Sequence, residues 1–288
     1  MRVIETVAGV REAVGKERGE GKRVGLVPTM GALHVGHEAL IARSVAECDV
    51  TVVSIFVNPI QFNQREDFER YPRELGQDVA TCNRVGAAIV FAPAHEEMYP
   101  RPLDTYVEPG KVAEHLCGPF RPGHFRGVAT VVCKLFHAVE ANRAYFGEKD
   151  AQQLAVIQRM VSDLNMAVEI VPVATVREHD GLAMSSRNAR LGEAERRAAP
   201  ALYAGLREAL ERLKSGEREA GRVKEAALAV IGREALARVE YLDVVDAASM
   251  QPVDQVAGPV RVAVAAWLGG VRLIDNVGFS ECPSNISG

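Results

Sequence analysis

Short apolar runs alternate with helical patterns over the first 176 residues of the chain. Apolar runs at residues 23–28 and 50–57 flank an expected helix at residues 36–47, which is the pattern of a parallel βαβ unit. The alternation continues, with strands expected at 87–93, 143–147 and 168–175 and helices at 72–85, 128–139 and 154–164. Five strands joined by helical crossovers predict an α/β fold with a doubly wound parallel sheet.

The pattern changes after Val176. Residues 192–216, and the segment that follows to Arg238, are rich in Ala, Glu and Arg and have helical periodicity. Three later runs, VEYLDVV, VRVAVAAWL and VRLIDNV, are typical of strands, and the Gly269–Gly270 pair predicts a hairpin between the last two. We therefore predict two domains: residues 1–176 with the parallel sheet, and residues 177–288 as a smaller α+β C-terminal domain.

The amino-acid composition makes several classes of binding partner unexpected. The net charge of −4 provides no bulk positive field, so neither nucleic acid nor an anionic membrane surface is an expected partner. The longest uncharged apolar run, residues 262–271, falls well short of the roughly 18 residues that a membrane span needs. The start of the chain is charged and lacks the apolar core of a signal peptide. Five cysteines without CxxC spacing fit reduced thiols, and the expected location is cytoplasmic.

The segment at residues 28–37 is the strongest candidate for chemistry, because it lies between the first apolar run and the first helix. Ligands of open α/β sheets bind beyond the carboxyl ends of strands, where helix N-termini present unpaired amides to anions. Gly31 and Gly36 allow close approach to the backbone, and His34 and His37 can donate hydrogen bonds to phosphate oxygens. We predict a phosphate site at this turn.

Other interpretations of the two histidines stay open at this point. One could cap the helix while the other lies on the surface, and a zinc site is a second competitor. Zinc is disfavoured because HExxH is absent and Glu38 follows His37 in the wrong order, so no metal ligands are predicted. The sequence also lacks a P-loop, a dinucleotide fingerprint after the strand, and a GxSxG nucleophile elbow.

Six ordered segments carry a resemblance to a known family: PTMGALHVGH, NPIQF with YPR downstream, GHFRGVATVV, YFGEKDAQQL, MSSRN and RLIDN. Together they resemble the pantothenate synthetases, or pantoate–β-alanine ligases, of the HxGH nucleotidyltransferase superfamily. The resemblance implies a Rossmann-like, ATP-binding first domain. It also implies condensation of pantoate with β-alanine through a pantoyl-adenylate, with release of AMP and pyrophosphate, and a homodimer. Mg²⁺ is expected mainly on the ATP phosphates, since the sequence offers no carboxylate cage.

Matching the family's motifs residue by residue assigns the site. His37 resembles the proton donor of the family, and His34 and Lys149 join it as expected catalytic residues because they place donors and charge on phosphate. Gln61 and Gln153 match the pantoate contacts, and Gln61 also the β-alanine contact. The expected ATP-binding residues are Met30, Gly31, Ala32, Leu33, His34, Val35, Gly36, His37, Gly147, Glu148, Lys149, Asp150, Val176, Met184, Ser185, Ser186 and Arg187.

Three further basic side chains carry a weaker signal. Arg121, His124 and Arg126 lie in a Gly- and Pro-rich segment that could be a lid, a pantoate-side patch or simply a structural loop.

Two competing functions also stay open. Another HxGH nucleotidyltransferase acting on a phosphate acceptor would want a cationic pocket where this chain has Gln61 and Gln153. The other is a nucleotide-sensing module without turnover.

Overall fold

The computed structural model describes residues 1–63 and 65–280, which form two compact units. The first unit comprises Met1–Pro109, Arg121–Glu148 and Val156–Val176. The second unit comprises Gly110–Phe120, Lys149–Ala155 and the chain from Arg177 onward. Each unit has its own sheet and its own hydrophobic core.

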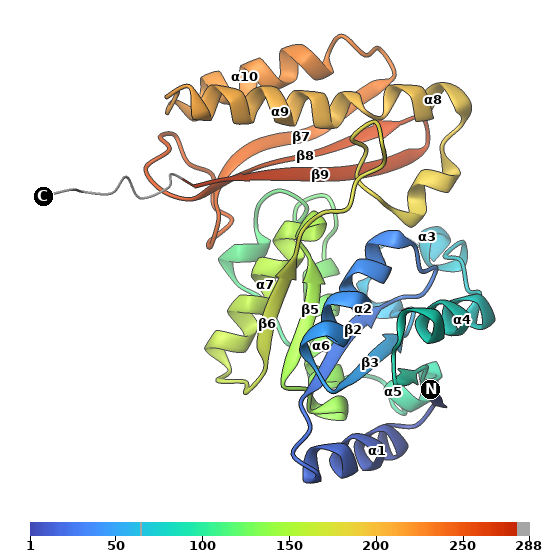
Figure 1. Ribbon diagram of the computed structural model, residues 1–288. Helices are drawn as coiled ribbons and strands as arrows, with labels where there is room; N and C mark the ends of the chain where they lie inside the picture. Colours follow the sequence, from blue (N-terminus) through green and yellow to red (C-terminus); the bar gives the residue numbers. More distant parts are fainter. Residues whose placement is uncertain (64, 281–288) are drawn as a thin grey trace, which may run out of the picture. The chain divides into compact units, whose positions relative to one another are not determined.

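A six-stranded parallel sheet forms the first unit (Figure 1), in the order β1-β4-β3-β2-β5-β6. Its strands are β1 (Arg2–Ile4), β2 (Val24–Thr29), β3 (Val50–Ile55), β4 (Ile89–Phe91), β5 (Arg143–Gly147) and β6 (Glu169–Val173). The chain builds outward from β2 to β3 and β4, and then crosses to β5 and β6 on the other side of β2. The strand order therefore reverses between β2 and β5, as in a doubly wound fold.

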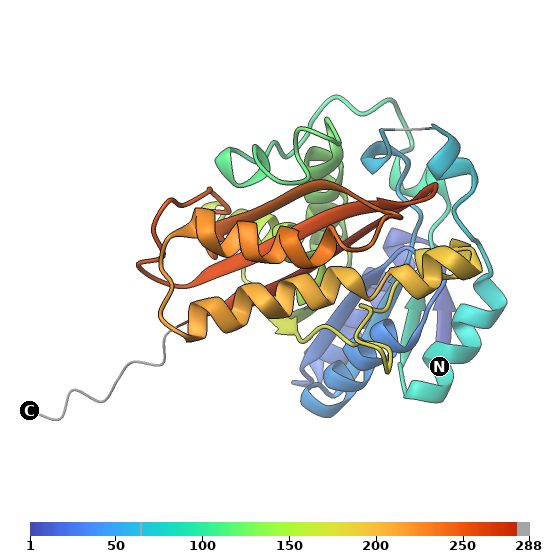
Figure 2. The same cartoon turned by 90° about the horizontal axis from the view of Figure 1, so that it is seen from above.

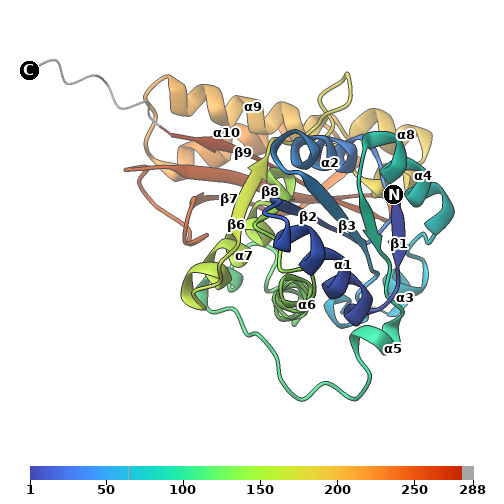
Figure 3. The ribbon, with the colours of Figure 1, turned by 60° about the horizontal axis from the view of Figure 1, so that its bottom comes forward.

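Helices cover both faces of this sheet. The helices of residues 1–109 are α1 (Val7–Gly19), α2 (Val35–Glu47), α3 (Arg65–Glu69), α4 (Leu75–Val85) and α5 (His95–Met98), with the 3₁₀ turn η1 (Pro59–Gln61). α6 (His124–Val139) packs beside α1 on one face, whereas α2 lies on the other with α4 (Figure 3). Leu40 and Ile41 of α2 and Cys82 of α4 pack on a row of strand side chains, Val27, Val53, Val90, Tyr145 and Val171.

The predicted fold class is confirmed, with differences at the start of the chain. The sheet has six strands because β1 pairs with β4, and α1 precedes β2. A strand of three residues has too little alternation to be recognised, and the charges on α1 hide the apolar face formed by Val10, Ala13 and Val14. The five expected strands are all present, with ends that differ by up to two residues.

The second unit contains an antiparallel sheet in the order β7-β8-β9, formed by β7 (Ala237–Asp246), β8 (Val260–Leu268) and β9 (Val271–Phe279). The expected hairpin at Gly269–Gly270 is present, because Leu268 pairs with Val271. The helices α9 (Ala201–Lys214) and α10 (Ala220–Ile231) run along this sheet (Figure 2) and pack on one of its faces. Short elements complete the unit: η2 (Lys111–Ala113), η4 (Ser186–Arg190) and α8 (Glu193–Ala198).

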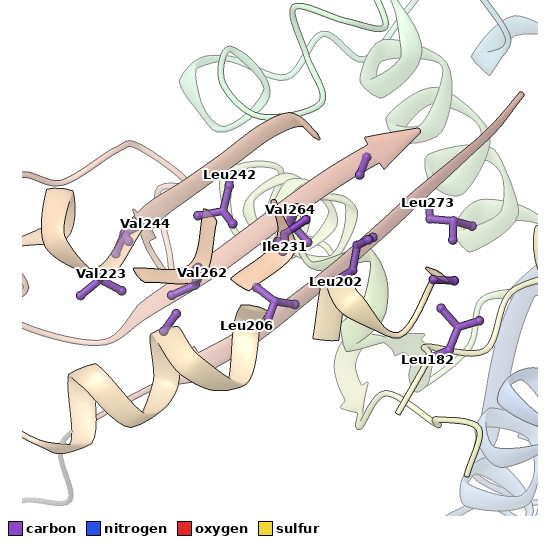
Figure 4. Packing of buried hydrophobic residues seen from close by; sticks show 14 of the residues in the cluster. Leu182, Leu202, Leu206, Val223, Ile231, Leu242, Val244, Val262, Val264 and Leu273 are labelled. Atoms are coloured by element: carbon purple, nitrogen blue, oxygen red, sulfur yellow. The ribbon is translucent and has the colours of Figure 1, made fainter. Parts of the chain in front are cut away.

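A cluster of aliphatic side chains holds the helices of the second unit on its sheet. Leu202 and Leu206 of α9 and Ile231 of α10 meet Val262 and Val264 of β8 (Figure 4). The helical pattern expected over 192–216 divides into α8 and α9 at Ala199 and Pro200, because proline has no amide hydrogen to continue the first helix.

The predicted domain boundary falls at one of the points where the chain passes between units, after Val176. Residues 110–120 and 149–155, which the sequence pattern assigns to the first domain, group with the second unit instead. The last residues of η3 (Glu148–Asp150) and the first part of α7 (Ala151–Asp163) therefore belong to the second unit.

The helices and the cysteines of the structure can be compared with the expectations from composition. Among residues 1–63 and 65–280, no helix is both long and apolar enough to span a membrane. The four described cysteines, Cys48, Cys82, Cys117 and Cys133, are free thiols, and Cys282 lies outside the described residues.

Candidate active site

Predicted site residues of the first unit lie at the carboxyl ends of four parallel strands. Met30 directly follows β2, Gln61 ends the η1 turn after β3, Gly147 ends β5 and Val176 follows β6. β2 and β5 are the two strands between which the strand order reverses. In open α/β sheets this switch point is where ligands bind, so the turn from Met30 to His37 occupies the expected position.

Side chains hold the backbone of the turn after β2. The Thr29 hydroxyl accepts from the Gly31 amide at 3.2 Å, and the Asp78 carboxylate accepts from the amides of Ala32 (3.0 Å) and Leu33 (2.8 Å). Gly31 (φ +82°) and Ala32 (φ +52°) both have left-handed conformations. A Cβ on Gly31 would lie 2.7 Å from the Asp78 Oδ2 atom, so glycine is required there.

The two histidines cap α2 reciprocally. His34 is the N-cap residue, and its Nδ1 accepts from the Gly36 amide at 3.1 Å, while the His34 amide donates to His37 Nδ1 at 3.3 Å. A neutral imidazole has one accepting and one donating nitrogen. Because both Nδ1 atoms accept, both ring hydrogens lie on Nε2, and the rings pack with centroids 4.2 Å apart.

This arrangement changes how the turn can bind an anion. The amides of Gly31, Ala32, Leu33, His34 and Gly36 each donate to a side chain, so these five are not unpaired donors for a phosphate. The interpretation of one histidine as a helix cap is correct, and it extends to both histidines. Capping and phosphate binding are compatible, since capping uses Nδ1 and leaves the hydrogen on Nε2.

Gln61 is buried, and its amide is oriented by Asn58. Asn58 Nδ2 donates to the Gly127 carbonyl (3.1 Å) and to Gln61 Oε1 (3.0 Å), and Asn58 Oδ1 accepts from the Tyr99 hydroxyl (2.7 Å). Since a carbonyl oxygen only accepts, Gly127 determines which end of the Asn58 amide faces it. Gln61 Nε2 consequently points at the Met30 Sδ atom, 2.9 Å away.

The start of α6 and the turn before it bring His124 and Arg121 to the backbone of Gln61. His124 Nδ1 donates to the Gln61 carbonyl at 2.9 Å, and Arg121 Nη1 lies 3.1 Å from His124 Nε2. Arg126 is directed elsewhere, to Glu108 at 3.6 Å and over the Tyr106 ring. Of the three weak candidates, Arg121 and His124 therefore adjoin the η1 turn and Arg126 does not.

The second unit holds Lys149 through the RLIDN segment of β9. Asn276 Nδ2 donates to the Lys149 carbonyl at 3.0 Å, and Asn276 Oδ1 accepts from Arg261 at 2.7 Å. The neighbouring Asp275 is bound by both terminal nitrogens of Arg177, at 2.6 and 3.0 Å. Burial raises the pKa of Asp275, whereas Arg177 and, more weakly, Lys149 act to lower it.

The MSSRN segment is also anchored within the second unit. Ser185 caps η4 by accepting from the Arg187 amide at 3.2 Å. Asn188 donates to Glu178 at 2.8 Å and to the Ala183 carbonyl at 3.1 Å. Arg196 in turn binds Glu178 at 2.7 Å, so Met184–Arg187 extends from a fixed base.

The structure separates the roles of two adjacent glutamines on α7. Gln152 is buried and bonds to the backbone of the 110–120 segment, accepting from Cys117 and donating to Val112 and His115. Gln153 is only partly buried. A side chain engaged by three backbone groups is structural, whereas the assignment of Gln153 to substrate stays a prediction.

The predicted site residues divide between the units. The first unit contains Met30–His37, Gln61, Gly147, Glu148 and Val176, and the second contains Lys149, Asp150, Gln153 and Met184–Arg187. Sequence reasoning missed Asn58, Asp78, Tyr99 and Asn276 as supporting residues. Asp78 has a recognisable signal, because it lies four residues before Cys82 on the buried face of α4.

A doubly wound nucleotide-binding fold with an HxGH turn at its switch point is the class that these features define. The family model described as pantoate-beta-alanine ligase matches residues 2–278. Pantothenate synthetase 1 of Bradyrhizobium diazoefficiens is 53% identical over 285 residues, covering 99% of this chain and 100% of the relative. The chain therefore belongs to the pantoate–β-alanine ligase family.

Solved structures agree with this assignment. Pantothenate synthetase from Thermus thermophilus has a TM-score of 0.91 and 44% identity, covering 96% of this chain and 99% of that chain. Pantoate–β-alanine ligase from Francisella tularensis, complexed with beta-gamma ATP and β-alanine, has a TM-score of 0.78 and 32% identity. The match covers 96% of this chain and 97% of that chain. The resemblance inferred from the six sequence segments is confirmed.

The capping geometry predicts the tautomers of the two histidines. In ¹⁵N NMR spectra recorded above the histidine titration range, His34 and His37 should each show a non-protonated Nδ1 and a protonated Nε2. The substitutions His34→Gln and His37→Gln assign the signals. A protonated Nδ1 on either ring would contradict the reciprocal cap.

Proposed function

We propose that this chain is an ATP-dependent ligase that condenses (R)-pantoate with β-alanine to pantothenate, releasing AMP and pyrophosphate. The single observation that carries the proposal is the HxGH turn at the switch point of the sheet, in a chain that belongs to the pantoate–β-alanine ligase family. The Francisella tularensis ligase was crystallised in complex with beta-gamma ATP and β-alanine, which supports the same ligands here.

In the first unit we assign the turn from Met30 to His37, with Gly147, Glu148 and Val176, to ATP. His34 and His37 donate through Nε2 to phosphate oxygens. These hydrogen bonds strengthen most where negative charge develops on the leaving pyrophosphate. Gln61 presents Nε2 to pantoate and, in the second step, to β-alanine. Its fixed amide suits a substrate that offers a carboxylate and hydroxyl oxygens as acceptors.

In the second unit we assign Lys149 and Met184–Arg187 to the phosphates, Asp150 to the nucleotide and Gln153 to pantoate. Lys149 and Arg187 supply positive charge, and Ser185 and Ser186 supply hydroxyl donors. The Asn276 bond to the Lys149 carbonyl supports this role, because it fixes the backbone from which the lysine side chain extends.

The proposed reaction has two steps. A pantoate carboxylate oxygen forms a bond to the α-phosphorus of ATP, and the bond from that phosphorus to the bridging oxygen breaks, releasing pyrophosphate. The β-alanine amine then forms a bond to the carbonyl carbon of pantoyl-adenylate, the carbon–oxygen bond to AMP breaks, and the amine loses a proton. Neither step uses a covalent bond to the enzyme.

The proposal extends to Mg²⁺, assembly and location. Among residues 1–63 and 65–280, no group of three or more His, Cys, Asp or Glu side chains is placed to hold a metal ion. Mg²⁺ would therefore bind mainly to ATP phosphate oxygens, where it neutralises charge on the leaving group. We further propose a homodimer in the cytoplasm, with small-molecule substrates and no nucleic-acid or membrane partner.

The bond that breaks is testable with labelled pantoate. Pantoate carrying ¹⁸O in its carboxylate should transfer one label to AMP, because the oxygen that attacks phosphorus leaves with the adenylate. Mass spectrometry of the products provides the measurement. Label in inorganic phosphate, together with ADP, would instead indicate an acyl phosphate and would exclude the adenylate route.

The two nitrogens of His37 can be tested separately. His37→Asn keeps an acceptor near the position of Nδ1 but lacks the Nε2 donor, so kcat should fall by about 100-fold or more while the helix cap persists. His37→Gln, which can place an amide N–H near the Nε2 position, should lose less. Circular dichroism and the unfolding midpoint check the fold. Wild-type kcat in a folded His37→Asn variant would assign His37 to capping alone.

A further inference from the structure

Asp78 is a buried residue whose carboxylate hydrogen-bonds to backbone amides. The residue is 3% exposed, and its two carboxylate oxygens accept from the amides of Ala32 and Leu33. Within the described part of the chain, no basic side chain pairs with it. Buried acids are ordinarily paired with a cation, so this carboxylate is maintained at a cost in free energy that calls for a reason.

The carboxylate lies against the residues of the turn that have unusual backbone conformations. Ala32 has a φ of +52°, which residues with a Cβ rarely adopt, and it is the Ala32 amide that donates to Asp78 Oδ2. Such a conformation persists where its surroundings determine it. The adjacent Leu33 amide binds the other oxygen, so one carboxylate fixes two consecutive peptide groups of the turn.

The position of Asp78 also affects where the turn can bind an anion. Two consecutive amides that point in one direction would by themselves attract a phosphate oxygen. Asp78 already occupies both, and its negative charge repels an anion from that position. The same charge acts on a neighbouring group, because burial and Asp78 together raise the pKa of the Cys82 thiol to about 12.

We propose that Asp78 is a positioning residue for ATP: it locks the turn at Ala32 and Leu33 and directs the triphosphate to the imidazole pair of His34 and His37. This inference rests on the proposed function, in which the turn binds ATP. Asp78 itself does not contact substrate. Its effect should therefore fall on ATP, because pantoate is assigned to Gln61 and Gln153.

The substitution Asp78→Asn tests this role. The amide oxygen can accept from one of the two N–H groups, but the NH₂ group then faces the other, so the turn loses its double anchor. The KM for ATP should rise about ten-fold or more, and the Kd for ATP from calorimetry without pantoate should rise equally. The KM for pantoate should stay within about two-fold.

Asp49→Asn is the matched control. Asp49 also accepts from a backbone amide, that of Arg23 at 2.8 Å, but at the opposite end of β2 from the turn. Its KM for ATP should not change. If Asp78 is merely structural, Asp78→Asn will lower the unfolding midpoint while both KM values stay unchanged, and that result would overturn the proposal.

Changes at Ala32 supply a second test of the same mechanism. Glycine tolerates a positive φ without help, so adding Ala32→Gly to Asp78→Asn should recover part of the ATP affinity. If Asp78→Asn does not fold, Ala32→Val strains the same turn with Asp78 intact and should also raise the KM for ATP. An unchanged ATP affinity in Ala32→Val would overturn the proposal.

The proposed function and the role of Asp78 can fail separately. If the wild-type protein binds ATP but forms no AMP with pantoate and β-alanine, the ligase function fails, while the calorimetric comparison still decides the role of Asp78. If wild-type protein does not bind ATP, both fail. If AMP forms and the Asp78→Asn affinity is unchanged, only the role of Asp78 is rejected.

Discussion

Side chains, not other backbone groups, accept the hydrogen bonds of the amides at the turn between β2 and α2. Thr29 binds Gly31, Asp78 binds Ala32 and Leu33, and the two histidines bind Gly36 and His34. A turn held in this way has little freedom before any ligand arrives. That matters for phosphoryl chemistry, in which positioning and electrostatic stabilisation supply most of the rate. Because the Nδ1 atom of each histidine accepts from a backbone amide, the ring hydrogen of each imidazole lies on Nε2 and points in a fixed direction.

The same principle recurs at the other candidate residues. Gln61 is held by Asn58, whose own amide is oriented by the carbonyl of Gly127. A Cβ on Gly127 would lie 2.4 Å from the Ile60 carbonyl, so only glycine lets α6 approach the η1 turn closely enough for this bond. In the second unit, Asn276 holds the Lys149 carbonyl and Asn188 anchors the loop that follows Ala183. The side-chain amides of Asn58 and Asn276, whose oxygen and nitrogen are both hydrogen-bonded, thus orient the groups expected to touch substrate.

Much of the first unit could be predicted from the sequence, because its buried strands are strong apolar runs separated by regular helices. The position of the HVGH segment after the first of these runs was sufficient to place it at the carboxyl edge of the sheet. β1 was missed because three residues carry too little pattern. Segments 110–120 and 149–155 group with the second unit through tertiary contacts such as those of Gln152, which the sequence pattern does not contain. The supporting residues Asp78 and Tyr99 were missed for a related reason. The role of a single buried polar residue depends on its hydrogen-bond partner, which only the fold brings near. The partner of Asp78 is the Ala32 amide, and the partner of Tyr99 is the Asn58 side chain.

A crystal structure with a non-hydrolysable ATP analogue tests the central claim most directly, namely that the side-chain-capped turn binds triphosphate through the two imidazole Nε2 donors. We expect phosphate oxygens within about 3 Å of Nε2 of His34 and His37. The bonds from Ala32 and Leu33 to Asp78, and the reciprocal cap through both Nδ1 atoms, should be unchanged. A triphosphate bound by the amides of Ala32 and Leu33, with Asp78 displaced, would contradict the account.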